Sequence, residues 1–249
     1  MKTLHWTSLA LLSCSASAGP RPLVTIDSAH DNVHTIDGRY NELAALLRGV
    51  GYRARGHDTV DLPERSQVHI MAGLRAPLPD TEVDALVSWV DQGGSLLVAA
   101  DHPPFATPPN SLVERFGFSV IAGSVADEDE NTDFALRPSS HHPIISGIEE
   151  VWVYTGAAVA FPPEATILLP LGLSHQLTLR GFTFDPIEPE TLAVAAIRRY
   201  GDGRVAILSE SGMIGCHVNS SDIPYGLCAP EAEENPTFAL ALVDWLAHL

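Results

Sequence analysis

The sequence contains almost no lysine. Of its 14 basic side chains, all but Lys2 are arginines. No lysine after Lys2 is therefore present to form a Schiff base, to anchor pyridoxal phosphate or to serve in a phosphate-binding P-loop. Basic groups are also few beside 31 acidic ones, and the formal net charge is -17 at pH 7. Nucleic acids and anionic lipids bind through basic groups, so we expect no nucleic-acid partner and favour neutral or cationic ligands.

Long hydrophobic runs are absent as well. A short apolar stretch lies near the start of the chain. Lys2 precedes the apolar residues 4–12, and small residues at Ala16 and Ala18 resemble a signal-peptidase site. This pattern predicts a signal peptide over residues 1–18 and an exported protein, either periplasmic or secreted. No segment approaches the roughly 20 apolar residues that a membrane-spanning helix needs, so we expect no integral membrane segment.

Cysteine occurs only three times in the sequence. Cys14 ends the sequence LLSC, which is similar to a bacterial lipobox, so an alternative to secretion is a lipoprotein anchored through Cys14. Cys216 and Cys228 then remain as an even pair in a chain that we expect to reach an oxidising compartment. The sequence therefore predicts a disulfide between Cys216 and Cys228.

The remaining chain has the composition of a globular protein, with 45% apolar residues, and we predict one α/β domain over residues 19–249. Short β-rich runs alternate with amphipathic stretches in its first half. The run at 95–100 shows no polar alternation, which is typical of a central parallel strand buried on both faces. The predicted strands are 23–26, 52–55, 68–72 and 95–100, and the predicted helices are 40–50, 80–92 and 111–116.

The second half is less regular. Residues 118–190 contain strand-like stretches at 151–160 and 166–171 between prolines and loops, and we interpret this part as an irregular, β-rich insertion. A strand pair at 192–199 and 204–208 follows, and a final helix begins after Asn235 as its N-cap. Alternating strands and helices predict a mainly parallel sheet with helices on both faces.

Polar side chains follow three of the predicted strands. Ligands of open parallel sheets bind beyond the carboxyl ends of the strands, so these side chains are the candidate site. We expect them to meet at one edge of the sheet although they lie far apart in the chain. They are Asp27, His30, Asp31, Asn32 and His34 after the first strand, Asp101 and His102 after the central strand, and Glu210, Ser211 and, slightly further on, His217 after a late strand.

Several segments resemble one group of exported bacterial proteins of uncharacterised function. That resemblance implies a class I glutamine amidotransferase-like, flavodoxin-like fold, distantly similar to trehalose-utilisation-type proteins and to the GIFT domain of an intraflagellar transport protein. The segments are DSAHDNVH at 27–34, GGSLLVAADH at 93–102, HPIISGI at 142–148, GRVAILSESGM at 203–213 and ENPTFALALVDWL at 234–246.

The amidotransferases of this class use a cysteine nucleophile after a central strand, and this sequence departs from that pattern. Asp101 and His102 stand at that turn, so glutamine hydrolysis through a thiolate is excluded. Ser211 is a weak substitute, because the sequence SESG at 209–212 lacks the glycine of a nucleophile elbow two residues before the serine.

Two classes of function remain open. The first is a non-catalytic domain that binds a small polar molecule, such as a carbohydrate or a cell-envelope component, through Asp27, His30, Asp31, His34 and Ser211. The alternative is a hydrolase in which Asp101 or Glu210 is the general base and His30, His34 or His102 is a ligand or an acid. Such a hydrolase could hold a divalent metal such as zinc, because imidazole and carboxylate groups are its usual ligands. The candidate metal ligands are His30, His34 and Asp101.

Other conspicuous side chains are expected to have structural roles. His69 lies within an apolar strand and is expected to be a buried, hydrogen-bonded imidazole, and Pro143 is expected to start a structural segment after His142. Trp89 and Trp245 fall on apolar helix faces and are predicted to be core residues. A third tryptophan, Trp152, lies on one side of a predicted strand together with a tyrosine and could line a sugar-binding surface.

Overall fold

The computed structural model describes residues 22–179, 182–188, 190–219 and 221–249. The predicted signal peptide over residues 1–18 and the predicted lipidation site Cys14 lie outside the described residues. Nowhere in the described ranges does a helix combine the length and apolar character that crossing a membrane requires.

A nine-stranded sheet forms the centre of the molecule, with the order β2-β1-β3-β4-β14-β13-β9-β5 and β10 also paired to β13. The first five strands in this order are parallel to one another. Their order corresponds to the 2-1-3-4-5 order of flavodoxin, which confirms the predicted α/β fold. The bounds are β1 Leu23–Asp27, β2 Arg53–His57, β3 Val68–Ala72, β4 Ser95–Ala99, β5 Ser119–Ile121, β9 Ala158–Ala160, β10 Thr166–Pro170, β13 Ala193–Tyr200 and β14 Gly203–Leu208.

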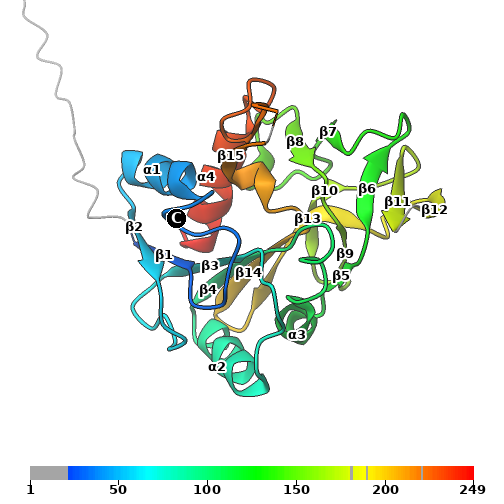
Figure 1. The fold of residues 1–249 in the computed structure, drawn as a ribbon. Helices are drawn as coiled ribbons and strands as arrows, with labels where there is room; N and C mark the ends of the chain where they lie inside the picture. Colours follow the sequence, from blue (N-terminus) through cyan, green and yellow to red (C-terminus); the bar gives the residue numbers. More distant parts are fainter. Residues whose placement is uncertain (1–21, 180–181, 189, 220) are drawn as a thin grey trace, which may run out of the picture.

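Helices cover both faces of the parallel part of the sheet, as predicted (Figure 1). On one face lie α1 (Asn41–Gly49) and α4 (Asn235–Leu246), whose side chains share a hydrophobic core. On the other face lie α2 (Asp80–Asp91) and α3 (Asn110–Val113), which belong to a second core. Every residue of β3 and β4 is buried, which is why these strands lack the polar alternation of a half-exposed sheet.

Two helix predictions need correction. The helix predicted over 111–116 is only one turn of α3 followed by the 3₁₀ turn η1 (Glu114–Phe116), and Gly117 ends it with a positive φ of 83°. Asn235 is the first residue of α4 and not its N-cap, which is Glu234. The buried Asn235 side chain instead bonds to both the amide and the carbonyl of Trp152 and to the carbonyl of Met213.

The predicted insertion is β-rich and irregular. It supplies β5, β9 and β10 to the main sheet, a three-stranded sheet β12-β11-β6, and the pair β7-β8. The strand predicted over 151–160 is interrupted because Thr155 adopts a positive φ of 55°. The additional bounds are β6 Ser124–Asp127, β7 Asp133–Leu136, η2 Pro143–Ile145, β8 Val151–Tyr154, β11 His175–Leu179 and β12 Phe182–Pro186.

The connection from β2 to β3 contains no helix. Residues 58–67 cross from one side of β1 to the other, since both β2 and β3 pair with β1. Parallel strands usually need a crossover of a dozen or more residues, most often with a helix that covers the sheet. This short crossover leaves a gap between itself and α2. Trp89 lies at that gap. It and Trp245 pack against the two hydrophobic cores, as predicted, but each is only partly buried.

A disulfide joins Cys216 and Cys228, as predicted, with the two Cα atoms 5.3 Å apart. It closes a hairpin of β15 (Cys216–Val218) and β16 (Pro224–Gly226) that follows the 3₁₀ turn η3 (Gly212–Ile214). The amide of Cys216 also donates to the carbonyl of Arg39, so the hairpin is tied to the segment before α1.

Replacing both cysteines by serine is expected to lower the free energy of unfolding by about 3 kcal/mol, because the unfolded chain regains the freedom that the closed loop had removed. Urea denaturation of the double variant C216S/C228S measures the loss. The wild type in reducing buffer serves as the matched comparison and should unfold at the same urea concentration as the variant. Equal midpoints for the oxidised wild type and the variant would contradict the prediction.

Candidate functional site

Three of the predicted site residues meet around the hydroxyl of Ser211. The Oγ atom of Ser211 lies 2.8 Å from Nε2 of His34, and it donates a hydrogen bond to Oδ2 of Asp101. His34 follows β1, Asp101 follows β4 and Ser211 follows β14, so the parallel order of these strands brings the three side chains to one edge. All three residues are buried. We refer to them as the serine cluster.

The positions of the protons decide what the serine cluster can do. A serine hydroxyl has one proton, and here the Asp101 carboxylate accepts it, so Nε2 of His34 must donate to Oγ. Burial lowers the pKa of His34 to about 4, which keeps the ring neutral at pH 7. A catalytic serine instead gives its proton to the histidine, and the aspartate orients that histidine. In this arrangement Ser211 is therefore not activated as a nucleophile.

Glu210 lies next to the serine cluster but faces backbone amides. Its carboxylate accepts hydrogen bonds from the amides of Gly212 and Met213, the latter at 2.7 Å. Complete burial raises the pKa of Glu210 well above its usual value, and the negative charge of Asp101 raises it further. Because its oxygens are occupied by η3, Glu210 fixes the turn that carries Ser211.

His102 is the solvent-facing member of this edge. Its Nδ1 atom lies 2.5 Å from Oδ1 of Asp101, and its side chain is 42% exposed. The hydrogen bond to Asp101 raises the pKa of His102. Asp101 thus bridges the buried serine cluster and a half-exposed imidazole.

A second group of polar residues surrounds His30. Its Nδ1 atom lies 2.8 Å from Oδ2 of the buried Asp27, and its Nε2 atom lies 2.9 Å from Oε2 of Glu82 in the first turn of α2. The hydrogen bond to Asp27 is the main reason that the pKa of His30 rises to about 8, with a smaller contribution from Glu82. His30 is therefore largely protonated at pH 7.

The structure thus divides the predicted site residues into two groups. Asp27 and His30 belong to the group on Glu82, whereas His34 belongs to the serine cluster, with His102 bound to its Asp101. Asp31 joins neither carboxylate–histidine group; its exposed side chain pairs with Arg75 at 3.5 Å. Among the described residues no three histidine, cysteine, aspartate or glutamate side chains are arranged to hold a metal ion.

Two residues of this edge were not found from the sequence. Glu82 completes the His30 group, and Tyr40 donates from its hydroxyl to the carbonyl of Ser211 at 3.0 Å. An acidic residue in the first turn of a helix is common because it complements the helix dipole, so Glu82 gave no distinct signal. Tyr40 was visible only as an apolar position of a predicted helix.

A cavity of about 240 Å³ opens beside the His30 group. It lies between α2 and the crossover at 58–67, and His30 and Glu82 stand at its wall together with His57, Asp61 and His69. The Nε2 atom of His57 is hydrogen-bonded to the carbonyl of Asp61 at 2.7 Å. We call this cavity the histidine pocket. His69 is buried and bonds to Oγ1 of Thr25 at 2.9 Å, which confirms the buried imidazole expected from the sequence.

The buried histidines predict a loss of stability in acid. Burial lowers the pKa of His69 to about 4, as it does for His34, so the folded state keeps these rings neutral. The unfolded state binds their protons below about pH 6.5, so each ring should cost about 2 kcal/mol of stability between pH 7 and pH 5. Urea denaturation at both pH values should show a smaller loss for His69→Asn than for the wild type. The exposed His141→Gln variant is the control, and equal losses in all three proteins would contradict the prediction.

His30 predicts the opposite dependence on pH. Its pKa rises from 6.5 to about 8 on folding, so its contribution is complete below pH 6.5 and disappears as the pH rises through 8. Allowing for solvent screening, we expect the free energy of unfolding to fall by about 1 kcal/mol between pH 6.5 and pH 9. His30→Gln should remove this fall, whereas His141→Gln should retain it. A fall of the same size in His30→Gln would show that another group causes it.

No family model matches the sequence, and no curated protein matches it. Solved structures do share its fold. The mmIFT52 N-terminal domain superimposes with a TM-score of 0.70 at 18% identity, covering 90% of this chain and 96% of that one. A ThuA-like protein from Parabacteroides merdae gives a TM-score of 0.53 at 10% identity and covers 91% of this chain and 90% of that one.

A beta-galactosidase from Bacillus circulans also contains this fold. The TM-score is 0.54 at 10% identity, and the match covers 92% of this chain but only 31% of the galactosidase. At these identities the similarity concerns the fold alone. The chain therefore has the flavodoxin-like α/β fold of glutamine amidotransferase-like and ThuA-like proteins.

Proposed function

We propose that this protein is an exported binding domain that takes a small polar molecule, of the carbohydrate or cell-envelope class, in the histidine pocket and does not convert it. The observation that carries the proposal is the state of Ser211. Its hydroxyl is completely buried and already engaged by His34 and Asp101, so the hydroxyl that a hydrolase of this kind needs is neither exposed nor activated.

The groups that do reach a cavity are suited to recognition. His30 carries a proton at neutral pH and is held on both ring nitrogens by Asp27 and Glu82, so its position is fixed before a ligand arrives. The walls of the pocket also carry the hydroxyl groups of Thr59 and Thr81. A few fixed polar groups in a concave site are the usual basis of specificity for small ligands.

The negative net charge of the chain favours an uncharged ligand over an anionic one. A formal net charge of -17 repels anions over most of the surface, and carboxylates and imidazoles line the pocket. An uncharged ligand with many hydroxyl groups can use both as hydrogen-bond partners. The presence of this fold as part of a beta-galactosidase is compatible with a carbohydrate ligand.

Export is part of the proposal. The disulfide between Cys216 and Cys228 is the supporting observation, because such bonds persist in oxidising compartments and are rare in the cytosol. The signal-like segment at 1–18 and the lipobox alternative at Cys14 are two routes to the same side of the membrane.

A hydrolase remains the second candidate, because one contact favours it. Ser211, His34 and Asp101 bring together a hydroxyl, an imidazole and a carboxylate, with His102 and Glu210 beside them. If the hairpin after η3 moved away, Asp101 could serve as a general base with His102 as the acid. The metal-dependent form of this hypothesis would need His30, His34 and Asp101 to hold one zinc ion. Their arrangement does not fit such a site, because His30 is bound to Asp27 and Glu82 and lies outside the serine cluster.

Binding to a panel of glucose, galactose, N-acetylglucosamine and small peptidoglycan fragments tests the proposal by thermal shift and calorimetry. We expect at least one compound to bind, and His30→Gln and Glu82→Gln to weaken that binding about tenfold each, because each removes one hydrogen-bonding or orienting group. His141→Gln and Glu42→Gln are the matched controls on exposed positions and should bind as the wild type does.

The same samples decide between binding and hydrolysis. In the proposed case Ser211→Ala and Asp101→Asn leave the affinity unchanged, and chromatography of the bound compound recovers it intact. Turnover of nitrophenyl esters or glycosides that disappears in Ser211→Ala or Asp101→Asn would instead establish the hydrolase. Stoichiometric zinc in the purified protein that is lost in His34→Ala would establish its metal-dependent form. Absence of any binding by the panel would overturn the proposal.

A further inference from the structure

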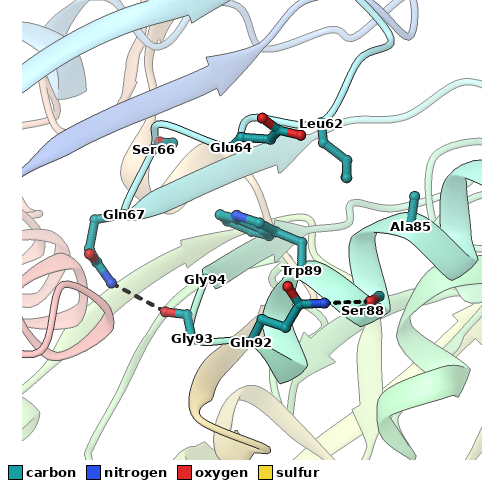
Figure 2. Close-up of a pocket in the computed structure, with 10 residues that line it drawn as sticks. All are labelled: Leu62, Glu64, Ser66, Gln67, Ala85, Ser88, Trp89, Gln92, Gly93 and Gly94. Atoms are coloured by element: carbon teal, nitrogen blue, oxygen red, sulfur yellow. Dashed lines mark hydrogen bonds between the residues drawn. The ribbon is translucent and has the colours of Figure 1, made fainter.

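A second cavity lies beyond the histidine pocket, toward the amino ends of β3 and β4. It has a volume of about 500 Å³ and is formed by α2, the crossover at 58–67 and the turn that precedes β4 (Figure 2). The missing helix between β2 and β3 leaves this space open. We call it the tryptophan trough, because the indole of Trp89 lies in its middle, between Glu64 and Gly94.

The indole ring is held flat against the backbone. A Cβ atom placed on Gly94 would lie only 2.2 Å from Cε2 of Trp89, so the ring packs directly on the glycine. It forms a T-shaped pair with the ring of His69, with the centroids 6.5 Å apart and the planes at 88°. An aromatic ring that is fixed in this way and remains partly exposed offers a preorganised flat surface to a ligand.

Hydrogen-bonding groups surround the indole. The amides of Gln67 and Gln92 are each anchored through their nitrogen atoms, to the carbonyl of Gly93 at 3.3 Å and to the hydroxyl of Ser88 at 2.9 Å (Figure 2). This leaves their oxygen atoms as acceptors. Within the described residues the carboxylate of Glu64 has no hydrogen-bond partner, and it adds further acceptors at the wall of the trough. Hydroxyl groups are the donors that such acceptors match.

The two cavities are neighbours along α2. Leu62 and Ala85 line both of them, and the histidine pocket adjoins the first turns of the helix whereas the trough adjoins its last turns. From Glu82 to Trp89 the helix rises by about 10 Å, which is longer than one sugar ring. A sugar ligand that uses both cavities must therefore have more than one ring.

We propose that the tryptophan trough is a sugar-stacking subsite, and that the ligand of this protein is an oligosaccharide whose one end lies on Trp89 and whose other end reaches the histidine pocket. A pyranose ring presents a flat face of C–H groups to the indole and directs its hydroxyl groups to the surrounding acceptors. This inference extends the proposed function. It depends on the proposed function only for the end of the ligand that reaches the histidine pocket. A quaternary ammonium ligand fits less well, because such cations are bound by several aromatic rings and the trough has one.

Calorimetry of the intact protein with defined oligosaccharides tests the proposal. The probes are chito-, cello- and galacto-oligosaccharides of increasing length together with their monosaccharides and choline. For the matching series we expect affinity to rise with chain length, and Trp89→Leu to lower the affinity for the longer chains about tenfold with little effect on the monosaccharide. Trp89→Phe should retain part of the affinity.

Gly94→Ala is the sharper variant, since it keeps every polar group and displaces only the indole. Gly94 does not have a positive φ, so alanine fits the backbone, and the clash with the ring is the expected effect. The affinity for the longer chains should again fall about tenfold. Trp245→Phe, at a partly buried tryptophan outside the trough, is the control, and circular dichroism confirms that each variant is folded.

The outcomes separate this inference from the proposed function. If His30→Gln weakens binding while Trp89→Leu and Gly94→Ala do not, the trough is not a subsite and the inference is overturned, whereas the histidine pocket stands. If the Trp89 variants weaken binding while His30→Gln and Glu82→Gln do not, the trough binds sugar alone and the proposed function fails. Binding of choline but of no oligosaccharide would overturn the sugar assignment.

Discussion

The parallel order of five strands is the constraint on which the candidate site depends. In the order β2-β1-β3-β4-β14, every carboxyl end lies at one edge of the sheet, so the residues that follow β1, β4 and β14 must approach one another. His34, Asp101 and Ser211 meet there, with the hydroxyl group of Ser211 bonded to the other two side chains. The same edge carries His30 between Asp27 and Glu82, with a different electrostatic outcome.

The two histidines show how burial and charge oppose each other at this edge. His34 is enclosed by the sheet and η3, and burial outweighs the attraction of Asp101, so its pKa falls to about 4. His30 lies nearer to solvent and is held by two carboxylates, so its pKa rises to about 8. One imidazole is therefore neutral and sealed, whereas the other is cationic and adjoins a cavity. This contrast favours recognition at His30 over chemistry at Ser211.

The short crossover between β2 and β3 determines where the cavities lie, because it leaves part of the sheet uncovered beside α2. A helix at this position would cover the sheet beside β1 and bury Trp89 from that side. Residues 58–67 do not cover it, and the two cavities along α2 follow directly from that omission. Four apolar residues of α2 recur at helical spacing, namely Val83, Leu86, Val87 and Val90. Val87 is partly buried and the other three are fully buried. Trp89 stands next to Val90 on the helix, at the margin of that face.

Local patterns in the sequence are enough to specify the individual strands and helices. The runs at 68–72 and 95–99, the helix at 80–91 and the pairing of Cys216 with Cys228 all follow from periodicity, turn residues and composition, which act over a few positions. The partners of the polar residues, in contrast, depend on the tertiary fold. The contact of Ser211 with His34, and the placing of Glu82 on His30, join loops from different strands and a helix. Such contacts depend on how the chain crosses the sheet, and local sequence patterns carry no information about that path.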